Sequence, residues 1–462
     1  MHFLNSLNDF LWSYILIILL LGLALYFTIR SRGVQFRMIK EMVRIMLGRD
    51  RSEEEKKASH LGSFQAFAIS LASRVGTGNL AGVASAIFVG GPGAVFWMWI
   101  TALLGAATAF VESTLAQLYK RKGSQGFYGG PAYYMETGLG KKWMGILFSV
   151  LIVLSFALAN NIMQSNTIVD SLHSTLGFNK IITGVVLTLA AMSIIIGGVK
   201  RISKFMSYIV PVMALGYLLL AVGIAVFYAD RIPAAFGEIF RGAFGLRQIG
   251  GGMMGAAIMQ GVRRGLFSNE AGEGSAPNAA AVAVTSHPVK QGLVQALGVF
   301  IDTIVICSCT ALIIIIGGQY TGGADGIVLT LSSLEALVGP AARYFVTFAV
   351  FLFAFSTLIA NAYYGETNIR FITSKRGGIW VFWLVSALCI FFGAVGSLST
   401  AWAIVDICMA LLTLCNLVAI GLLSKQAFRL LEDYRKQKKS VKEPQFRKSS
   451  MPDIADKLEG WD

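Results

Sequence analysis

The chain has 462 residues, of which 55% are hydrophobic and 14% are charged, and its formal net charge is +14. Soluble domains carry about 25% charged residues, so this composition indicates that lipid rather than water is the main solvent. A positive chain can also bind nucleic acid, but here the basic residues are spread over the connections between apolar segments. That placement argues against nucleic acid as a partner.

The five cysteines lie inside apolar stretches, and none has the spacing of a metal site. The C-x-C pair would point its two thiols about 200° apart on a helix, which makes them poor co-ligands. We therefore expect small buried hydrophobic side chains, and no metal beyond a transported cation, at Cys307, Cys309, Cys389, Cys408 and Cys415.

The first apolar segment, residues 10–29, is predicted to cross the membrane. The sequence before it, MHFLNSLND, contains no Lys or Arg, and the basic sequence RSRGVQFR follows it. A signal peptide has a basic start and a shorter apolar core, so this segment is expected to remain as a span with its N-terminus outside.

Ten further segments have the length and apolar character of membrane spans. They are residues 62–91, 93–119, 143–170, 179–198, 204–228, 250–285, 290–318, 340–369, 379–397 and 399–424. The last two are separated only by Gly396–Ser399, which requires a tight turn.

The basic residues support this count of eleven spans. With the N-terminus outside, the cytoplasmic connections and tail hold 31 of the 39 Lys and Arg, whereas the outside connections hold three, Arg231, Arg241 and Arg247. One missed span would invert this bias in the remainder of the chain. We therefore predict a cytoplasmic C-terminus. Without a visible eukaryotic targeting segment, the expected location is the cytoplasmic membrane of a prokaryote.

Two segments are expected outside the membrane core. In residues 34–48, apolar side chains at helical spacing alternate with Arg37, Lys40 and Arg44, which predicts a helix lying on the inner membrane surface. The basic tail from Lys425 is expected to be helical as far as about Lys438 and disordered beyond it.

Two of the predicted spans contain residues that are costly in a continuous membrane helix. Residues 73–79, SRVGTGN, place two glycines, a charge and an amide at mid-depth, and residues 263–278, RRGLFSNEAGEGSAPN, place four charges, three glycines and a proline there. Non-helical backbone at this depth is tolerated where it is buried in protein or lines a watery cavity, so both helices are predicted to be broken. For one such motif alone, close helix packing at Gly-x-Gly is the alternative.

The two breaks fall in the first helix of each of two sets of five. Because five is odd, consecutive sets run in opposite directions, which is the arrangement of an inverted repeat. Unwound backbone offers N–H groups to a carboxylate and carbonyl oxygens to Na⁺, so the breaks suit an amino acid beside a coupling cation. The predicted parts are an additional N-terminal span (1–33), a cytoplasmic helix and loop (34–60), the first repeat (61–228), an extracytoplasmic connection (229–249), the second repeat (250–424) and the tail (425–462).

At these motifs the chain resembles the alanine/glycine:cation symporter family, also called sodium:alanine symporters. The segments GTGNLAGVASAI, GGPGAVFWMW, GPAYYME and RGLFSNEAGEGSAPNAAA carry the resemblance, which covers nearly the whole chain. It implies an all-α LeuT-type fold with one additional helix, and secondary active import of alanine or glycine with sodium, without another cofactor. Glu273 departs from the apolar residue that many members have, which bears on substrate size or ion coupling.

The candidate substrate contacts come from both breaks and from the fourth span. In the first break, backbone amides can meet a carboxylate, and in the second Phe267 is expected to close over a small side chain. The resemblance adds Gln164, for which hydrogen bonding to a neighbouring helix is an equal alternative. The candidates are Thr77, Gly78, Asn79, Gln164, Phe267, Ser268 and Asn269.

The candidate cation ligands come from the first break and the ninth span. The Phe353 carbonyl and the Ser356 and Thr357 hydroxyls, at i, i+3 and i+4, can present three oxygens on one helix face. The alternative is that the hydroxyls only bond back to their own helix. Similarity to the LeuT-type group implies that the Ala72 and Val75 carbonyls face the same sodium ion.

Several charged residues in the spans have open roles. Arg74 is expected to anchor a helix or to pair with Glu270 rather than to bind substrate, and Glu273 is open between ion pairing and contact with the substrate ammonium. Asp302 and Asp406 each stand alone in an apolar span and are functional candidates for that reason, without predicted partners.

Other classes of function fit the sequence less well. The four histidines lie at span ends or in loops and no nucleophile–base set is visible, which argues against an enzyme. Paired broken helices favour alternating access over an open channel. A proton-coupled transporter, or one with a broader range of neutral amino acids, is the closer alternative. Stereochemistry, stoichiometry and oligomeric state are not predicted.

Overall fold

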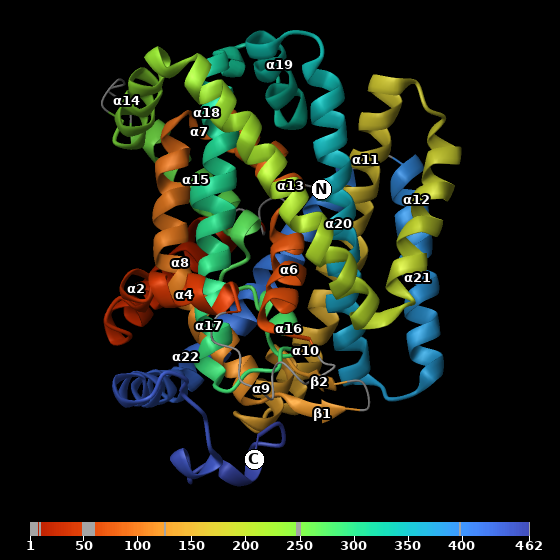
Figure 1. Ribbon diagram of the computed structural model, residues 1–462. Coiled ribbons are helices and arrows are strands. Elements are labelled where there is room, and N and C mark those ends of the chain that lie inside the picture. The colour runs from red at the N-terminus through yellow and green to blue at the C-terminus, as the bar shows by residue number, and fades with distance from the viewer. Residues whose placement is uncertain are drawn as a thin grey trace.

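The computed structural model of the chain describes residue 8 and residues 11–48, 61–123, 126–245, 251–396 and 399–461. Helices dominate this part, and the axes of most long helices lie roughly along one common direction (Figure 1). Its strands form one short hairpin, in which β1 (Arg121–Gly123) pairs antiparallel with β2 (Gly126–Tyr128). The architecture is therefore a helical bundle.

Helices are labelled α, and 3₁₀- or π-helical turns are labelled η. Before residue 245 they are η1 (Leu11–Leu16), α2 (Ile17–Arg30), α3 (Val34–Arg37), α4 (Ile39–Met46), α6 (Ser63–Arg74), η2 (Gly78–Gly82), α7 (Val83–Gly90), α8 (Gly93–Leu118), α9 (Pro131–Thr137), α10 (Lys142–Ile152), η3 (Val153–Asn160), α11 (Asn161–Leu176), α12 (Lys180–Ile195), α13 (Gly198–Phe227), η4 (Ala229–Arg231) and α14 (Ile232–Ala243).

The elements after residue 250 complete the bundle. They are α15 (Gly251–Asn269), α16 (Ala276–Ala280), α17 (Pro288–Val299), η5 (Phe300–Cys307), α18 (Ser308–Gly317), η6 (Gln319–Thr321), α19 (Gly326–Val338), α20 (Ala342–Ile372), α21 (Arg376–Val395), α22 (Ser399–Ser440), η7 (Lys448–Ser450) and η8 (Ala455–Lys457).

Within the described residues, seven helical segments are long and apolar enough to cross a membrane. They are Gly93–Leu118, Lys142–Leu176, Gly198–Phe227, Pro288–Gly317, Ala342–Ile372, Arg376–Val395 and Val405–Ser440. Four shorter apolar helices are Ile17–Arg30, Gly78–Gly90, Lys180–Ile195 and Gly326–Val338. The chain is thus a helical membrane protein with seven clear spans, and the full count of eleven goes beyond them.

The centre of the bundle is formed where α8 meets α15 and α17, and where α20 meets α11. Small residues allow this close approach: a Cβ atom at Gly292 of α17 would collide with Thr114 and Phe110 of α8. The outer helices instead expose large apolar side chains, among them Leu219 and Val226 of α13. Because lipid favours such surfaces, α12, α13 and α21 form a lipid-facing layer around the central helices.

The segment that follows the first helix is helical, but not continuous. Gly33 adopts a left-handed φ of 64°, and the helix is interrupted at Met38 between α3 and α4. Met42 and Ile45 are buried, and α4 packs against α17. The predicted amphipathic helix is therefore present, and protein covers only part of its apolar face, because Phe36, Ile39 and Val43 are exposed.

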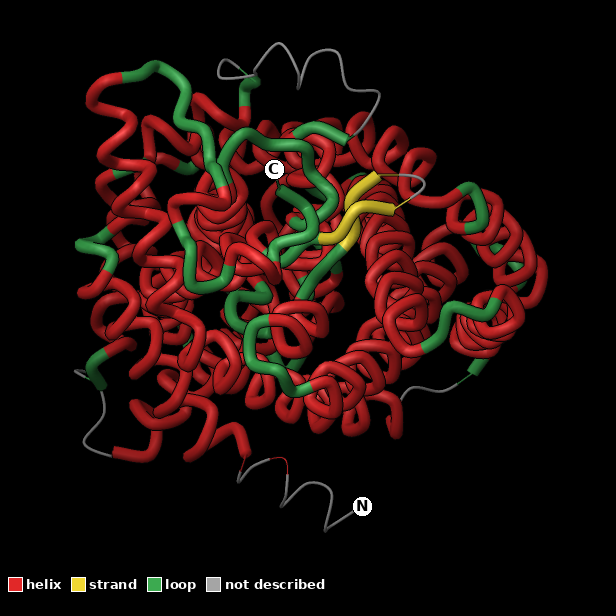
Figure 2. The backbone as a smooth tube through the Cα atoms, turned by 90° about the horizontal axis from the view of Figure 1, so that it is seen from below, coloured by secondary structure: helices red, strands yellow, loops and turns green. Residues whose placement is uncertain are grey.

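The expectation that the tail is disordered beyond Lys438 is wrong. Helix α22 continues to Ser440, and residues 441–461 fold back against the bundle beside the β1–β2 hairpin (Figure 2). Phe446, Leu458 and Trp461 are buried, and the Trp461 indole N–H donates to the Gln117 carbonyl at 3.0 Å. Aromatic and aliphatic side chains within a basic sequence thus give the tail enough apolar surface to dock.

Some predictions fall on residues that the structure does not describe. These are the N-terminal residues before Asn8, the loop 49–60, the connection 246–250, and part of the turn between the last two predicted spans. Conversely, the sequence did not anticipate α14, α19 or the β1–β2 hairpin. Each is a short element in a connection, where hydropathy gives little signal.

Candidate functional site

The first break separates α6 from α7. Helical hydrogen bonding stops at Val75, whose ψ is 80°, and resumes in the π-helical turn η2. The Asn79 side chain closes the break, because its Oδ1 accepts the Gly76 N–H at 2.9 Å. Gly76 has no room for a side chain, since an added Cβ would lie 2.5 Å from Thr357 Oγ1. The backbone at this break therefore touches α20 directly.

The second break follows α15. The helix ends at Asn269, and Glu270 then adopts a left-handed φ of 56°, as do Gly272 and Gly274 at 93° and 81°. Helix α16 starts at Ala276. Within the disrupted sequence 263–278 the non-helical residues are 270–275, so the charged pair Arg263 and Arg264 lies within regular helix.

One buried carboxylate links the two breaks. Asp302 on η5 accepts the Asn79 amide at 2.7 Å from the first break, and the Ser268 hydroxyl at 2.8 Å from the second. The Thr303 hydroxyl donates to it as well, at 2.8 Å. The sequence selected Asp302 without a partner, and the structure brings it together with two of the predicted substrate residues.

The remaining substrate candidates lie around this contact. A Cβ at Gly78 would come within 3.1 Å of the Phe267 ring, so the two breaks face each other across this glycine. The Gln164 amide of α11 donates to the Thr77 hydroxyl at 3.1 Å, and its carbonyl oxygen has no partner among the described residues. Asn269 instead donates to the Thr303 hydroxyl and accepts the Ala271 N–H, so it holds the start of the non-helical segment against η5.

Four of the five cation candidates meet where α20 contacts the first break. The Thr357 hydroxyl lies 2.9 Å from both the Ala72 and Phe353 carbonyls, and the Ser356 hydroxyl lies 2.9 Å from the Phe353 carbonyl. The hydroxyls thus bond back to their own helix and also reach α6. Val75 is the fifth candidate. The structure shows a hydrogen bond from its N–H to the Leu71 carbonyl at 2.8 Å, on the helical side of the break.

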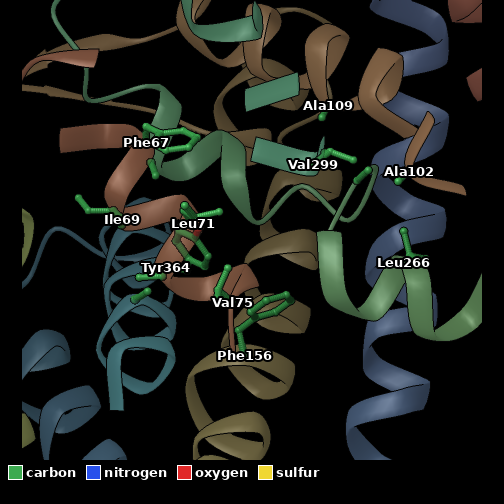
Figure 3. Packing of buried hydrophobic residues seen from close by; sticks show 14 of the residues in the cluster. Phe67, Ile69, Leu71, Val75, Ala102, Ala109, Phe156, Leu266, Val299 and Tyr364 are labelled. Atoms are coloured by element: carbon green, nitrogen blue, oxygen red, sulfur yellow. The ribbon is translucent and has the colours of Figure 1, made fainter. Parts of the chain in front are cut away.

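Apolar side chains pack beside the first break. Leu71, Val75, Phe156 and Tyr364 belong to one hydrophobic cluster around the first break (Figure 3). The rings of Phe156 and Tyr364 meet edge to face with centroids 6.1 Å apart. Such surroundings keep water away and strengthen electrostatic contacts to carbonyl and hydroxyl oxygens. Those are ligands that a hard monovalent cation accepts. The described residues contain no cluster of three or more His, Cys, Asp or Glu arranged for a metal ion.

Charged residues gather beside the second break. Glu270 accepts the Ser73 hydroxyl at 2.5 Å, and the Ser275 hydroxyl donates to it too. Arg74 donates to the Gln295 carbonyl on α17 at 3.2 Å, which is the position of a helix anchor. Arg263 on α15 pairs with Asp406, which the sequence left without a partner.

Glu112 on α8 is a buried carboxylate that sequence reasoning missed. It accepts the Gly272 N–H at 3.3 Å and the Asn416 amide at 2.9 Å, and so joins the second break to α8 and α22. The signal was present, because a lone carboxylate in an apolar span is the same signature that selected Asp302.

Known proteins show the family to which the chain belongs. The chain matches the model of the sodium:alanine symporter family over residues 1–448. It is 50% identical to the probable sodium/glutamine symporter GlnT of Bacillus subtilis, over 97% of this chain and 93% of the relative. It is 38% identical to the sodium/alanine symporter AgcS of Methanococcus maripaludis, over 91% of this chain and 94% of the relative.

The fold also has a solved counterpart. The crystal structure of MhsT in complex with L-phenylalanine matches with a TM-score of 0.56 at 15% identity, over 87% of this chain and 93% of that one. At this identity the match shows a shared fold, of the LeuT type. The relatives are transporters, which confirms the expectation that the chain is not an enzyme. The chain belongs to the sodium:alanine symporter family of multi-pass membrane proteins, which couple amino-acid transport to sodium.

Proposed function

We propose that this protein imports a small neutral amino acid, alanine or glycine, together with sodium by alternating access. The observation that carries the proposal is the meeting of the first break with α20, where Thr357 joins the Ala72 and Phe353 carbonyls. Carbonyl and hydroxyl oxygens at that place suit Na⁺, and the facing breaks leave backbone amides for a carboxylate.

The proposed substrate site lies between the breaks. In it, Thr77, Gly78 and Asn79 meet the substrate carboxylate, and Phe267 lies over the side chain. This assignment is supported by the approach of Phe267 to Gly78 and by the acceptor oxygen of Gln164, which has no partner in the described chain. Substrate residues are Thr77, Gly78, Asn79, Gln164, Phe267, Ser268 and Asn269; cation ligands are Ala72, Val75, Phe353, Ser356 and Thr357; gating or ion-pair residues are Arg74, Glu270 and Glu273.

Glutamine is a second candidate substrate. The relative with 50% identity bears the name of a probable sodium/glutamine symporter, whereas relatives named for alanine are 45% and 38% identical. Phe267 favours the smaller side chain because it narrows the space at Gly78. A broader range of neutral amino acids is therefore the alternative to alanine and glycine as substrates. Proton coupling is the alternative to sodium coupling.

We further propose eleven spans, with residues 61–228 and 250–424 as an inverted repeat, an outside N-terminus and a cytoplasmic C-terminus in a prokaryotic cell membrane. The distribution of Lys and Arg supports this topology. Labelling of single-cysteine variants tests this topology. An impermeant thiol reagent added to intact cells is expected to label Arg231→Cys and not Lys457→Cys.

Uptake into proteoliposomes tests the function. Labelled alanine, glycine, glutamine and leucine are supplied with an inward Na⁺ gradient or an equal K⁺ gradient. We expect concentrative uptake of alanine or glycine that requires Na⁺. Uptake that is indifferent to Na⁺ at constant pH would contradict sodium coupling, and preferential uptake of glutamine would replace the substrate.

Two variants test the site assignment in the same assay. Asn79→Ala is expected to weaken substrate binding, and Ser356→Ala is expected to raise the Na⁺ concentration needed for half-maximal uptake. Ser193→Ala is the matched control, because Ser193 lies on the outer helix α12 and its hydroxyl donates to the Ala190 carbonyl of the same helix. If both site variants behave like this control, the site lies elsewhere.

A further inference from the structure

Three carboxylates are buried around the second break. Glu270 and Glu273 belong to the non-helical segment between α15 and α16, and Glu112 projects from α8. None of the three residues is more than 3% exposed. Arg74 of α6 is the cation whose charge acts on all three. The charges are therefore unbalanced if every carboxylate is ionised.

Two of these carboxylates are satisfied by hydrogen bonds. Glu270 accepts hydroxyl groups from Ser73 and Ser275, and Glu112 accepts the Gly272 N–H and the Asn416 amide. Such donors stabilise a carboxylate that is cut off from water. The oxygens of Glu112 and Glu270 thus have donors, and these contacts fix the shape of the segment.

Glu273 differs from both. Neither of its side-chain oxygens has a hydrogen-bond partner in the part of the chain that the structure describes, and the residue is fully buried. Its backbone is held in place, because its N–H donates to the Glu270 carbonyl at 3.2 Å. A buried charge without a partner is costly, so an unsatisfied carboxylate of this kind points to a ligand that completes it.

The surroundings narrow the choice of ligand. Besides Arg74, Glu270 and Glu112, the titratable groups near the cluster are Tyr134 of α9, Cys415 of α22 and Tyr364 of α20. The described residues do not assemble a metal-binding group here. A proton is the ligand that fits, because it neutralises Glu273 without needing further ligands.

This inference rests on the proposed function of sodium-coupled symport. We propose that Glu273 is a proton-binding site and that one proton crosses the membrane through it in each transport cycle. The Glu273 carboxylate takes a proton from water on one side, which forms the neutral carboxylic acid, and releases it to water on the other side. No other bond is made or broken.

Protonation of Glu273 is expected to change the contacts of Arg74. One of its nitrogens donates to the Gln295 carbonyl of α17, while Nε and Nη2 have no partner in the described chain. Ionised Glu273 attracts these unused donors, and protonated Glu273 releases them. Because Arg74 is the last residue of α6, the proton alters the contact between the first break and α17.

The test compares proton and amino-acid flux in proteoliposomes with a pH dye inside and the membrane potential clamped. The substrate is the amino acid that the wild-type protein transports best, supplied with an inward Na⁺ gradient. We expect lumenal acidification of about one proton per labelled amino acid, and uptake that varies up to tenfold per pH unit. In Glu273→Gln the proton ratio falls to near zero and the pH dependence is lost, whatever the remaining rate.

Glu335→Gln is the matched control, since Glu335 on α19 pairs with Arg343 at the surface and is expected to keep the wild-type ratio. Wild-type uptake without acidification overturns the proposal, and so does an unchanged ratio in Glu273→Gln. A changed Na⁺ requirement at an unchanged ratio also overturns it, in favour of a cation site. If Glu273→Gln does not fold, Glu273→Asp is measured in its place. A wild-type ratio of about one proton per amino acid, with a shifted pH profile in Glu273→Asp, supports the proposal, and an unshifted profile overturns it. Absence of any Na⁺-dependent uptake by the wild type is a different result, because it contradicts the proposed function itself.

Discussion

At the scale of single residues, the buried carboxylate of Asp302 connects the two broken helices. It accepts hydrogen bonds from Asn79 and Ser268, which lie on different broken helices, and from its neighbour Thr303. Such donors are worth more when the acceptor is charged and water is excluded. One side chain on η5 therefore sets the distance between the two breaks.

Removing that carboxylate is expected to loosen the site. In Asp302→Ala, the Asn79 amide and the Ser268 hydroxyl lose their shared acceptor, and an unsatisfied buried donor costs about 1–3 kcal/mol. Because about 1.4 kcal/mol is a tenfold change, we expect uptake at low substrate concentration to fall by about tenfold or more. The measurement is initial uptake per folded protein. Asp456→Ala, at an exposed position of the docked tail, is the control, and equal uptake in the two variants would contradict this role of Asp302.

Thr357 allows a subtler change at the proposed cation site. Thr357→Val keeps the volume of the side chain but removes the hydroxyl that lies 2.9 Å from the Ala72 and Phe353 carbonyls. We expect the Na⁺ concentration for half-maximal uptake to rise by about tenfold, since a lost ligand costs about as much as a hydrogen bond to a charged group. The substrate concentration for half-maximal uptake at saturating Na⁺ should stay near the wild-type value. If both constants shift together, Thr357 serves packing instead.

How far these residues could be found from sequence depends on the range of the contact. The oxygens of Phe353, Ser356 and Thr357 were predicted together because their spacing within one helix is fixed. Glu112 and Asp302 carry a local signal, the lone charge in an apolar span, but their partners are 160 and 223 positions away. Hydropathy says nothing about which distant donor a buried carboxylate meets.

At the scale of elements, the two broken helices were predictable because their sequences cannot form continuous membrane helices. Both breaks lie where glycines, an amide and charges interrupt apolar sequence. The second is shorter than the sequence indicated, because Arg263 is paired with Asp406 and stays helical. An ion pair across the bundle thus rescues residues that look disruptive when the chain is considered alone.

The first break depends on a glycine with no space beside it. In Gly76→Ala the new Cβ would lie 2.5 Å from Thr357 Oγ1 and 3.3 Å from its other side-chain carbons. Either α20 or the break must move, so we expect transport to fall by at least about tenfold, as misplacement of about 1 Å can cost far more. The apparent melting temperature should fall too. Both are measured on purified protein.

Gly82 is the matched control in the same broken helix. A Cβ there meets nothing within 4 Å, and its φ of −66° is helical. Gly82→Ala is therefore expected to keep transport and to be neutral or slightly stabilising, because alanine favours a helix by about 1 kcal/mol over glycine. If Gly76→Ala and Gly82→Ala are equally active, close contact with Thr357 is not what fixes the break.

At the scale of the whole molecule, both ends of the chain are fastened to the helices that carry the breaks. Asp406 of α22 binds Arg263 of α15, and its backbone carbonyl accepts the Trp12 indole N–H at 3.2 Å. At the other end, the tail bonds to the segment after α16, where the Phe446 N–H donates to the Ser286 carbonyl at 2.8 Å. The first helix was predictable from hydropathy. The docked tail was not, because most of its residues are polar or charged and its few apolar residues give no hydropathy signal.

The last prediction concerns this tail. Trp461 is buried, its indole N–H donates to the Gln117 carbonyl, and its ring lies 4.1 Å from the Lys120 ammonium. Loss of a buried tryptophan costs about 3–5 kcal/mol in a well-packed core, and cation–π contact adds to it. Trp461→Ala is therefore expected to lower the apparent melting temperature by several degrees and to speed tryptic cleavage after Lys448.

Lys457→Ala is the control for that change, because Lys457 is exposed on the same tail. A second hold on the tail is the ion pair of Arg429 with Asp453, which keeps the pKa of Asp453 below its usual range. Folded-state pKa values below the unfolded value add stability at neutral pH that is lost as pH falls toward the folded value. The contribution of this ion pair should therefore persist in mild acid and be lost only below about pH 4, the ordinary pKa of an aspartate, as the melting temperature measured against pH would show. If Trp461→Ala melts and is cleaved like Lys457→Ala, the tail rests on the bundle without stabilising it.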